Sequence, residues 1–174
     1  MIVTIFGILI SKWLYNKKRY WVNLLESFII LPIVLPPTVL GFILLIIFST
    51  RSPVGEFFTN ILHLPVVFTL TGAVIASVIV SFPLMYQHTV NGFRSIDSKM
   101  LNTARTMGAS ETKIFLKLVL PLSKRSILAG IMMSFARAIG EFGATLMVAG
   151  YIPDKTNTLP LEIYFLVEQG KENE

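Results

Sequence analysis

The chain has no cysteine among its 174 residues and only two histidines. Without thiols it can form no disulfide, no thiol-based active site and no cysteine-ligated metal centre. His63 and His88 stand far apart, in segments that we expect to be separate loops, so they make a poor metal site. These counts argue against a metal site, and we also expect no cofactor and no catalytic residue.

Charge is also scarce: charged residues make up 14% of the chain and hydrophobic residues 53%, whereas about a quarter of a soluble domain is charged. Two segments, 28–48 and 66–86, carry no charge at all. Each has the length of about 20 residues that a helix needs to cross the hydrocarbon core. A third segment, 127–149, is as long but contains Arg137 and Glu141. This pattern predicts an all-α, polytopic membrane protein.

The basic residues predict how these segments are oriented. Eleven of the 15 fall in two stretches, 11–20 and 87–126, namely Lys12, Lys17, Lys18 and Arg19, and then Arg94, Lys99, Arg105, Lys113, Lys117, Lys124 and Arg125. Cytoplasmic loops are enriched in Lys and Arg, so both stretches should face the cytoplasm and loops 49–65 and 150–160 the outside. Because this placement explains the net charge of +5, we expect no nucleic-acid partner.

Both ends of the chain look cut. IVTIFGILI (2–10) is too short to span, and its basic residues follow it, whereas those of a signal peptide precede the apolar run. We interpret it as the second half of a span. The apolar run that starts at Leu159 stops before another span is complete. The prediction is one transmembrane domain over residues 1–174, truncated at both ends, in the cytoplasmic membrane.

The stretch 95–121 reads as two short helices. In SIDSKMLNTARTMGAS (95–110) apolar residues recur at helical spacing between charges, which is typical of an amphipathic helix. Gly108 is a plausible stop, and a second helix over 111–121 should end at Pro121. The first helix either lies on lipid headgroups or inserts its apolar face into a groove of a cytosolic partner.

Here the chain resembles permeases of ATP-binding-cassette importers. Their motif reads Glu-Ala-Ala, three residues, Gly, nine residues, then a hydrophobic residue, any residue and Leu-Pro. This chain keeps the spacing but has Asn and Thr in place of the Glu and the first Ala. The resemblance implies a coupling helix that sits in a cleft of an ATPase subunit, with the coupling residues Lys99, Asn102, Thr103, Ala104, Gly108, Leu118, Leu120 and Pro121.

The charges inside segment 127–149 need an explanation. Each ionised residue at mid-span raises the free energy of membrane insertion by about 3 kcal/mol. Eight strongly apolar residues of the same segment lower it by about 4 kcal/mol in total. Arg137 and Glu141 share a helix face at i and i+4 and can pair. They are either a structural ion pair, with Gly130, Gly140 and Gly143 allowing close helix packing, or a polar face of a translocation path or gate formed by Arg137, Gly140, Glu141 and Gly143.

Prolines are concentrated in segment 28–48. A proline inside a helix leaves a carbonyl unpaired, which a membrane tolerates only where protein or water satisfies it. Pro32, Pro36 and Pro37 in one segment therefore favour a broken helix near a gate, whereas Pro83 is an ordinary kink candidate.

FARAIGEFGATLMVAGYIPDKTNTLPLEIY (135–164) is similar to permeases for tetrahedral oxyanions, which join Arg-Ala-x-Gly-Glu-Phe-Gly-Ala to Thr-x-Thr-Leu-Pro. Thr145, Leu146 and Met147, together with LPIVLPPTVLGF (31–42), look more like the molybdate group than the sulfate group. The resemblance implies an importer-permease (MetI-like) helical bundle that works as a homodimer with two cytosolic ATPase subunits, an external binding protein and membrane lipid.

Molybdate is the expected substrate, with sulfate or tungstate as alternatives. No G-x-x-x-x-G-K-[ST] motif is present, so ATP hydrolysis should belong to a partner. Two other classes compete with this interpretation. A membrane enzyme would need more acid, base or ligand groups at one depth, and a non-transporting scaffold would need no ATPase.

Overall fold

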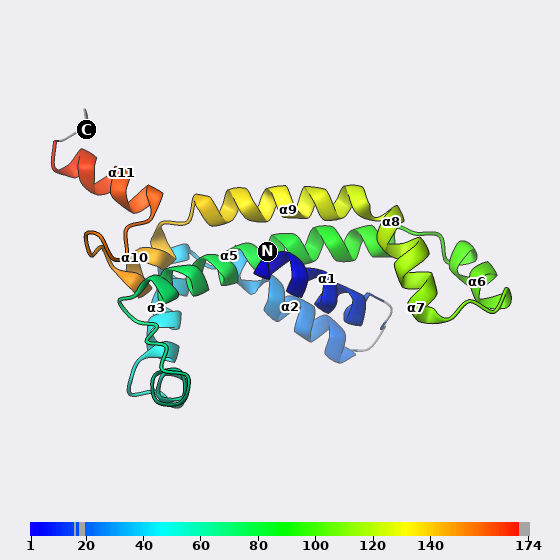
Figure 1. Ribbon diagram of the computed structural model, residues 1–174, viewed down its shortest axis with the longest axis horizontal. Coiled ribbons are helices and arrows are strands. Elements are labelled where there is room, and N and C mark those ends of the chain that lie inside the picture. The colour runs from blue at the N-terminus through cyan, green and yellow to red at the C-terminus, as the bar shows by residue number, and fades with distance from the viewer. Residues whose placement is uncertain (16, 18–19, 171–174) are drawn as a thin grey trace. The chain divides into compact units, whose positions relative to one another are not determined.

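The computed structural model describes residues 1–15, 17 and 20–170, and within them the regular structure is entirely helical (Figure 1). The all-α prediction is thus confirmed. Lys18 and Arg19 of the first basic stretch lie outside the described residues. The chain forms two compact units, residues 1–29 with 82–135 and residues 30–81 with 136–174. A single domain over 1–174 remains a prediction.

The first unit contains α1 (Ile2–Leu14), the start of α2 (Tyr20–Val34), the second half of α5 (Leu70–Arg94) and most of α9 (Lys124–Ile139). Between α5 and α9 lie α6 (Ser98–Thr106), α7 (Glu111–Ile114), the π-helix Phe115–Val119 and α8 (Leu120–Leu122). The second half of α5 runs alongside α9 (Figure 1). A Cβ on Gly130 would lie 3.0 Å from Cβ of His88, so the predicted close packing at this glycine is confirmed.

The second unit contains the end of α2, α3 (Pro37–Phe48), α4 (Pro53–Glu56), the π-helix Phe57–Ile61 and the start of α5. It also holds the last residues of α9, α10 (Gly143–Ala149) and α11 (Leu159–Glu168). The apolar run that starts at Leu159 is thus helical. The hydrophobic core of the second unit consists of residues from α3, α5 and α10 together with Val66. Its members are Leu40, Leu44, Val66, Ala76, Val80, Ala144 and Val148.

Two of the predicted spans are broken helices. The pairs α2–α3 and α9–α10 are each apolar enough to cross a membrane but are bent by more than 40° at the break. Among the described residues α5 alone is long and apolar enough as a continuous helix, and the count rises to three if each bent pair is one span. The break expected near Pro36 and Pro37 is confirmed: α2 ends before Pro36, and Pro37 is the first residue of α3. Proline suits this position because its fixed φ matches the helix and its missing N–H would have no helical partner.

Three sequence-based boundaries were wrong. The loop expected from residue 87 begins only after Arg94, because α5 continues through the predicted end of its span, and His88 is therefore helical. Pro121 does not end the second helix, which runs on as α8 to Leu122. Proline is tolerated in a first turn, where its missing N–H would have no helical partner, and here a π-helical turn ends directly before α8. The last predicted span is interrupted after Ile139.

Candidate functional site

The break between α9 and α10 brings the two charges of the third span together. Nη1 of Arg137, in the last turn of α9, lies 2.6 Å from Oε2 of Glu141. The Glu141 side chain is completely buried, whereas that of Arg137 is 32% exposed. The predicted pairing is confirmed, but the two residues do not share a continuous helix, because Glu141 lies in the break.

Glu141 also joins the break to the start of α10. Its Oε1 accepts a hydrogen bond of 2.7 Å from the backbone N–H of Ala144, in the first turn of that helix. The first N–H groups of a helix lack helical partners and favour a negative charge. Oε2 forms no hydrogen bond with any described group, and its contact is the ion pair with Arg137. Moving either residue would therefore disturb both ends of the break.

Glycines let α3 approach α10 closely. A Cβ on Gly41 would lie 2.7 Å from Cα of Ala144, and a Cβ on Gly143 would lie 3.1 Å from Cβ of Pro37. The packing role predicted for Gly143 is confirmed. That for Gly140 was wrong, because the nearest atom to its Cβ position is the carbonyl oxygen of Ala136 in its own helix, at 3.5 Å. Each broken span thus contributes one half-helix to the same tight contact.

The predicted coupling residues lie on and after α6. Asp97 caps this helix by accepting from the N–H of Lys99 at 2.8 Å. At the other end the N–H groups of Gly108 and Ala109 bond to the carbonyls of Arg105 and Ala104, which is a Schellman motif. Gly108 has φ of +82°, so the predicted stop is confirmed and has a backbone reason.

The two faces of α6 differ. Leu101 is buried and Ala104 half-buried against the core of the first unit. Lys99, Asn102 and Thr103 are exposed, and so are Met100 and Met107 of the predicted apolar face. Farther along, Leu118 and Leu120 pack on the core, while Pro121 is exposed. The predicted coupling residues therefore divide into a set that packs on the core and a set that is exposed.

Arg105 fastens α6 to α7. Its Nε and Nη2 donate to the two carboxylate oxygens of Glu111, at 2.6 and 3.2 Å, and its Nη1 donates to Oδ1 of Asn102 at 2.7 Å. The guanidinium holds the pKa of Glu111 below its ordinary value. Asn102, which stands where the importer motif has an acid, thus serves as a neutral acceptor for an arginine whose charge Glu111 already balances.

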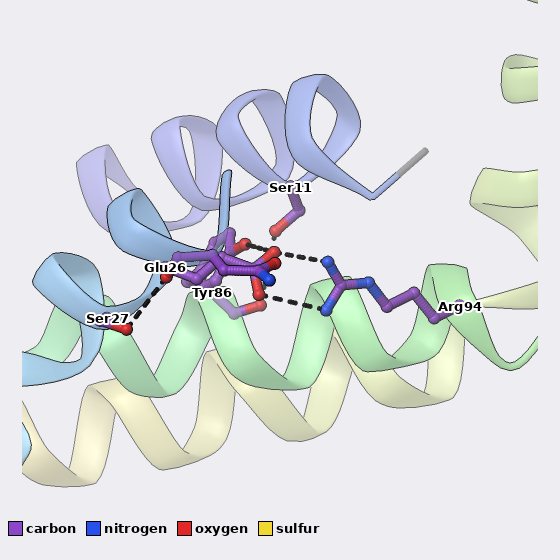
Figure 2. A network of polar contacts seen from close by, with 6 residues as sticks. Ser11, Glu26, Ser27, Tyr86 and Arg94 are labelled. Carbon is purple, nitrogen blue, oxygen red and sulfur yellow. Dashed lines mark hydrogen bonds and ion pairs between the residues drawn. The ribbon is translucent and has the colours of Figure 1, made fainter. Parts of the chain in front are cut away.

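A third polar cluster was missed by the sequence analysis. Figure 2 shows Glu26 of α2 facing Tyr86 and Arg94 of α5. The Tyr86 hydroxyl donates to Oε1 of Glu26 at 3.0 Å, and both Nη atoms of Arg94 contact the carboxylate. By sequence alone Arg94 is one of several basic residues in a predicted loop. Its place at the end of a helix, eight residues after Tyr86, was the only sequence signal, and helical spacing did not reveal Glu26 as the partner.

Among residues 1–15, 17 and 20–170 no group of three or more His, Asp or Glu side chains is arranged to hold a metal ion. Within this part of the chain the ion pairs each join one arginine to one glutamate. Such pairs can fix helices or move with them.

Residues 4–167 match the family described as binding-protein-dependent transport system inner membrane component. YvgM of Bacillus subtilis, assigned as a molybdenum transport system permease protein, is 46% identical over 170 residues, which cover 98% of this chain and 75% of that protein. ModB of Haemophilus influenzae, a molybdenum transport system permease protein, is 37% identical over 157 residues, covering 90% and 69%. A protein of Chlorella vulgaris assigned to sulfate transport, cysT, is 29% identical over 170 residues, covering 97% and 63%.

Proposed function

Because this chain belongs to the family of binding-protein-dependent transport system inner membrane components, we propose that it is the transmembrane permease subunit of an ATP-binding-cassette importer for molybdate. It crosses the cytoplasmic membrane several times and works as a homodimer. Two cytosolic ATPase subunits hydrolyse ATP, and an external binding protein delivers the anion. The permease itself catalyses no reaction.

The observation that carries this proposal is the helix–turn–helix segment formed by α6, the Gly108 turn and α7. It is short, capped at both ends and fastened by Arg105, so it can move as one piece. The exposed Met100 and Met107 provide the apolar contact expected of a helix that sits in a groove. A helix that only lay on the membrane would need no such clamp to its neighbour.

Motion of this helix–turn–helix segment has to reach a gate, and we propose that the gate is the break between α9 and α10. Arg137 and Glu141 connect the two half-helices across Gly140, whose Cβ position contacts no side chain and no neighbouring helix. A break bridged by one ion pair and one capping hydrogen bond can change its angle without unfolding either helix. The role of Gly143 is to keep α10 against α3 while the break opens and closes.

Molybdate is favoured over sulfate because the molybdenum permeases are more similar to this chain, at 46% and 37% identity against 29% for the protein assigned to sulfate transport. Both anions are tetrahedral and doubly charged, and so is tungstate. Which anion stimulates the assembled transporter is therefore the decisive observation.

The test reconstitutes the chain with its ATPase and binding-protein partners and measures ATP hydrolysis while molybdate or sulfate is added in turn. Stimulation by molybdate-loaded binding protein is expected, and Gly108→Pro should abolish it because proline cannot adopt the positive φ of this turn. ATPase activity of the purified chain alone would contradict the proposal. So would an anion response that survives in Gly108→Pro.

A further inference from the structure

An open groove of about 770 Å³ in the first unit lies beside the Glu26–Tyr86–Arg94 cluster. Its volume falls within the range of roughly 300–1,000 Å³ that is usual for ligand sites. Its lining comes from the residues that follow α1 and from α2, the end of α5, the turn after it and α6. Its polar members besides Glu26 are Tyr15, Lys17, Tyr20, Asn23, Arg94 and Ser98.

The groove favours an anion. Glu26 is its one acidic residue, and both carboxylate oxygens are already engaged by Arg94, with Tyr86 donating to one of them. A guanidinium has five N–H donors, and the contacts with Glu26 use two of them. Lys17 forms no ion pair within the described part of the chain, and its Nζ lies 3.8 Å from the ring centroid of Trp13. The remaining charge of the groove is therefore positive.

The surroundings of the groove are those of a membrane surface. Trp13, Tyr20 and Trp21 beside it are all more than half exposed, and such aromatic side chains gather at the level of the lipid headgroups. From Trp13 an exposed apolar stripe continues back along α1 through Leu9, Phe6, Ile5 and Ile2. An anion held in the groove could thus carry acyl chains along this stripe, which a free phosphate ion would leave bare.

We propose that this groove binds the phosphate headgroup of an anionic phospholipid of the cytoplasmic leaflet, with Lys17 and Arg94 as the cations. Basic pockets between membrane helices on the cytoplasmic side are suited to such headgroups. The proposal rests on the orientation given above, which puts residues 11–20 at the cytoplasmic surface, and is independent of the transported anion. The bound lipid would brace α1 and α2 against the end of α5.

The chain carries its own reporter, since its two tryptophans are Trp13 and Trp21. The full chain in phospholipid nanodiscs is titrated with phosphatidylglycerol or phosphatidylcholine that carries brominated acyl chains, and tryptophan quenching is measured. Phosphatidylglycerol should quench at a mole fraction about fivefold lower, from the attraction of one basic side chain to an anionic lipid. Lys17→Gln should remove this preference, and Lys17→Arg should keep it.

Lys117→Gln is the matched control, because it removes the same charge from an exposed position that does not line the groove. Its preference for phosphatidylglycerol should stay unchanged. The proposal is overturned if both lipids quench the wild-type chain equally, or if Lys117→Gln loses as much preference as Lys17→Gln. It is also overturned if excess inorganic phosphate abolishes the preference, because the site would then take a free anion.

Discussion

An arginine–glutamate ion pair occurs in two regions with opposite surroundings. Arg137 and Glu141 join across the break between α9 and α10, whereas Arg105 and Glu111 form the clamp that links α6 to α7. Arg137 meets a glutamate whose side chain is completely buried, whereas Arg105 meets one that is 64% exposed. A buried carboxylate that loses its partner keeps its full cost of desolvation. An exposed one is simply hydrated, and such surface pairs add little to stability. The Arg137–Glu141 pair should therefore stabilise the fold. The Arg105–Glu111 pair should add little stability and mainly fix the orientation of α6 relative to α7.

The sharpest test of this contrast is Glu141→Ala. It removes the partner of Arg137 and the acceptor of the Ala144 N–H in one step. We expect a loss of about 3 kcal/mol in the free energy of unfolding, measured by denaturation in detergent. Glu168→Ala, an exposed glutamate near the end of α11, is the control and should change stability by less than about 0.5 kcal/mol. Equal effects of the two substitutions would contradict the structural role of Glu141.

A second test concerns the packing that surrounds the buried pair. Gly41→Ala places a Cβ 2.7 Å from Cα of Ala144, and such overpacking costs about 1–3 kcal/mol. A Cβ at position 140 would meet only the carbonyl oxygen of Ala136, at an ordinary van der Waals distance of 3.5 Å. Gly140→Ala should therefore be tolerated, with a change within about 0.5 kcal/mol. Thermal unfolding of both variants in detergent checks the difference. If Gly140→Ala were the worse of the two, the close contact would lie elsewhere.

A third test addresses the backbone of the clamp. Gly108→Ala forces a side chain into a positive φ without any steric neighbour, at a cost of roughly 1–2 kcal/mol. Gly108→Asn should cost less, because asparagine adopts this conformation more readily. We expect ATPase stimulation to fall in the alanine variant and to recover in part in the asparagine variant. Equal loss in both would mean that the side chain, and not the turn, is at fault.

The smallest effect is expected at the exposed pair itself. Arg105 lowers the pKa of Glu111, so the stability that the pair contributes is present above the ordinary pKa of glutamate. It is lost as the pH falls through the lowered folded value. In Arg105→Gln the pKa of Glu111 should return toward its ordinary value, as an NMR titration of the Glu111 side chain would report. An unchanged pKa would show that the contact does not persist in solution.

Several features of both regions were predictable from the sequence, because each depends on residues that are close together in the chain. Gly108 ends α6 because a Schellman turn needs a positive φ, and Pro36 and Pro37 break their segment because proline removes a donor. Both rules act within a few residues. The pairing of Arg137 with Glu141 was predicted for the same reason, from a spacing of four.

What the sequence could not supply depends on distant partners. Glu141 leaves the helix and caps α10, whose position is fixed by the close contact of Gly41 with Ala144 about a hundred residues away. Glu26 contacts Tyr86 and Arg94, which lie 60 and 68 residues farther along the chain. Pro121 lies inside a helix because a π-helical turn directly precedes α8. No periodicity in the chain encodes any of these three arrangements.

The central claim is that the chain moves an oxyanion when ATP is hydrolysed, and uptake measures this most directly. Proteoliposomes that contain the permease and its ATPase, supplied with the loaded binding protein outside and ATP inside, should accumulate molybdate in preference to sulfate. Accumulation should fall at least tenfold in Glu141→Gln, which keeps the size of the side chain but removes the charge facing Arg137. Molybdate entry that needs no ATP, or that is unchanged in Glu141→Gln, would contradict the account.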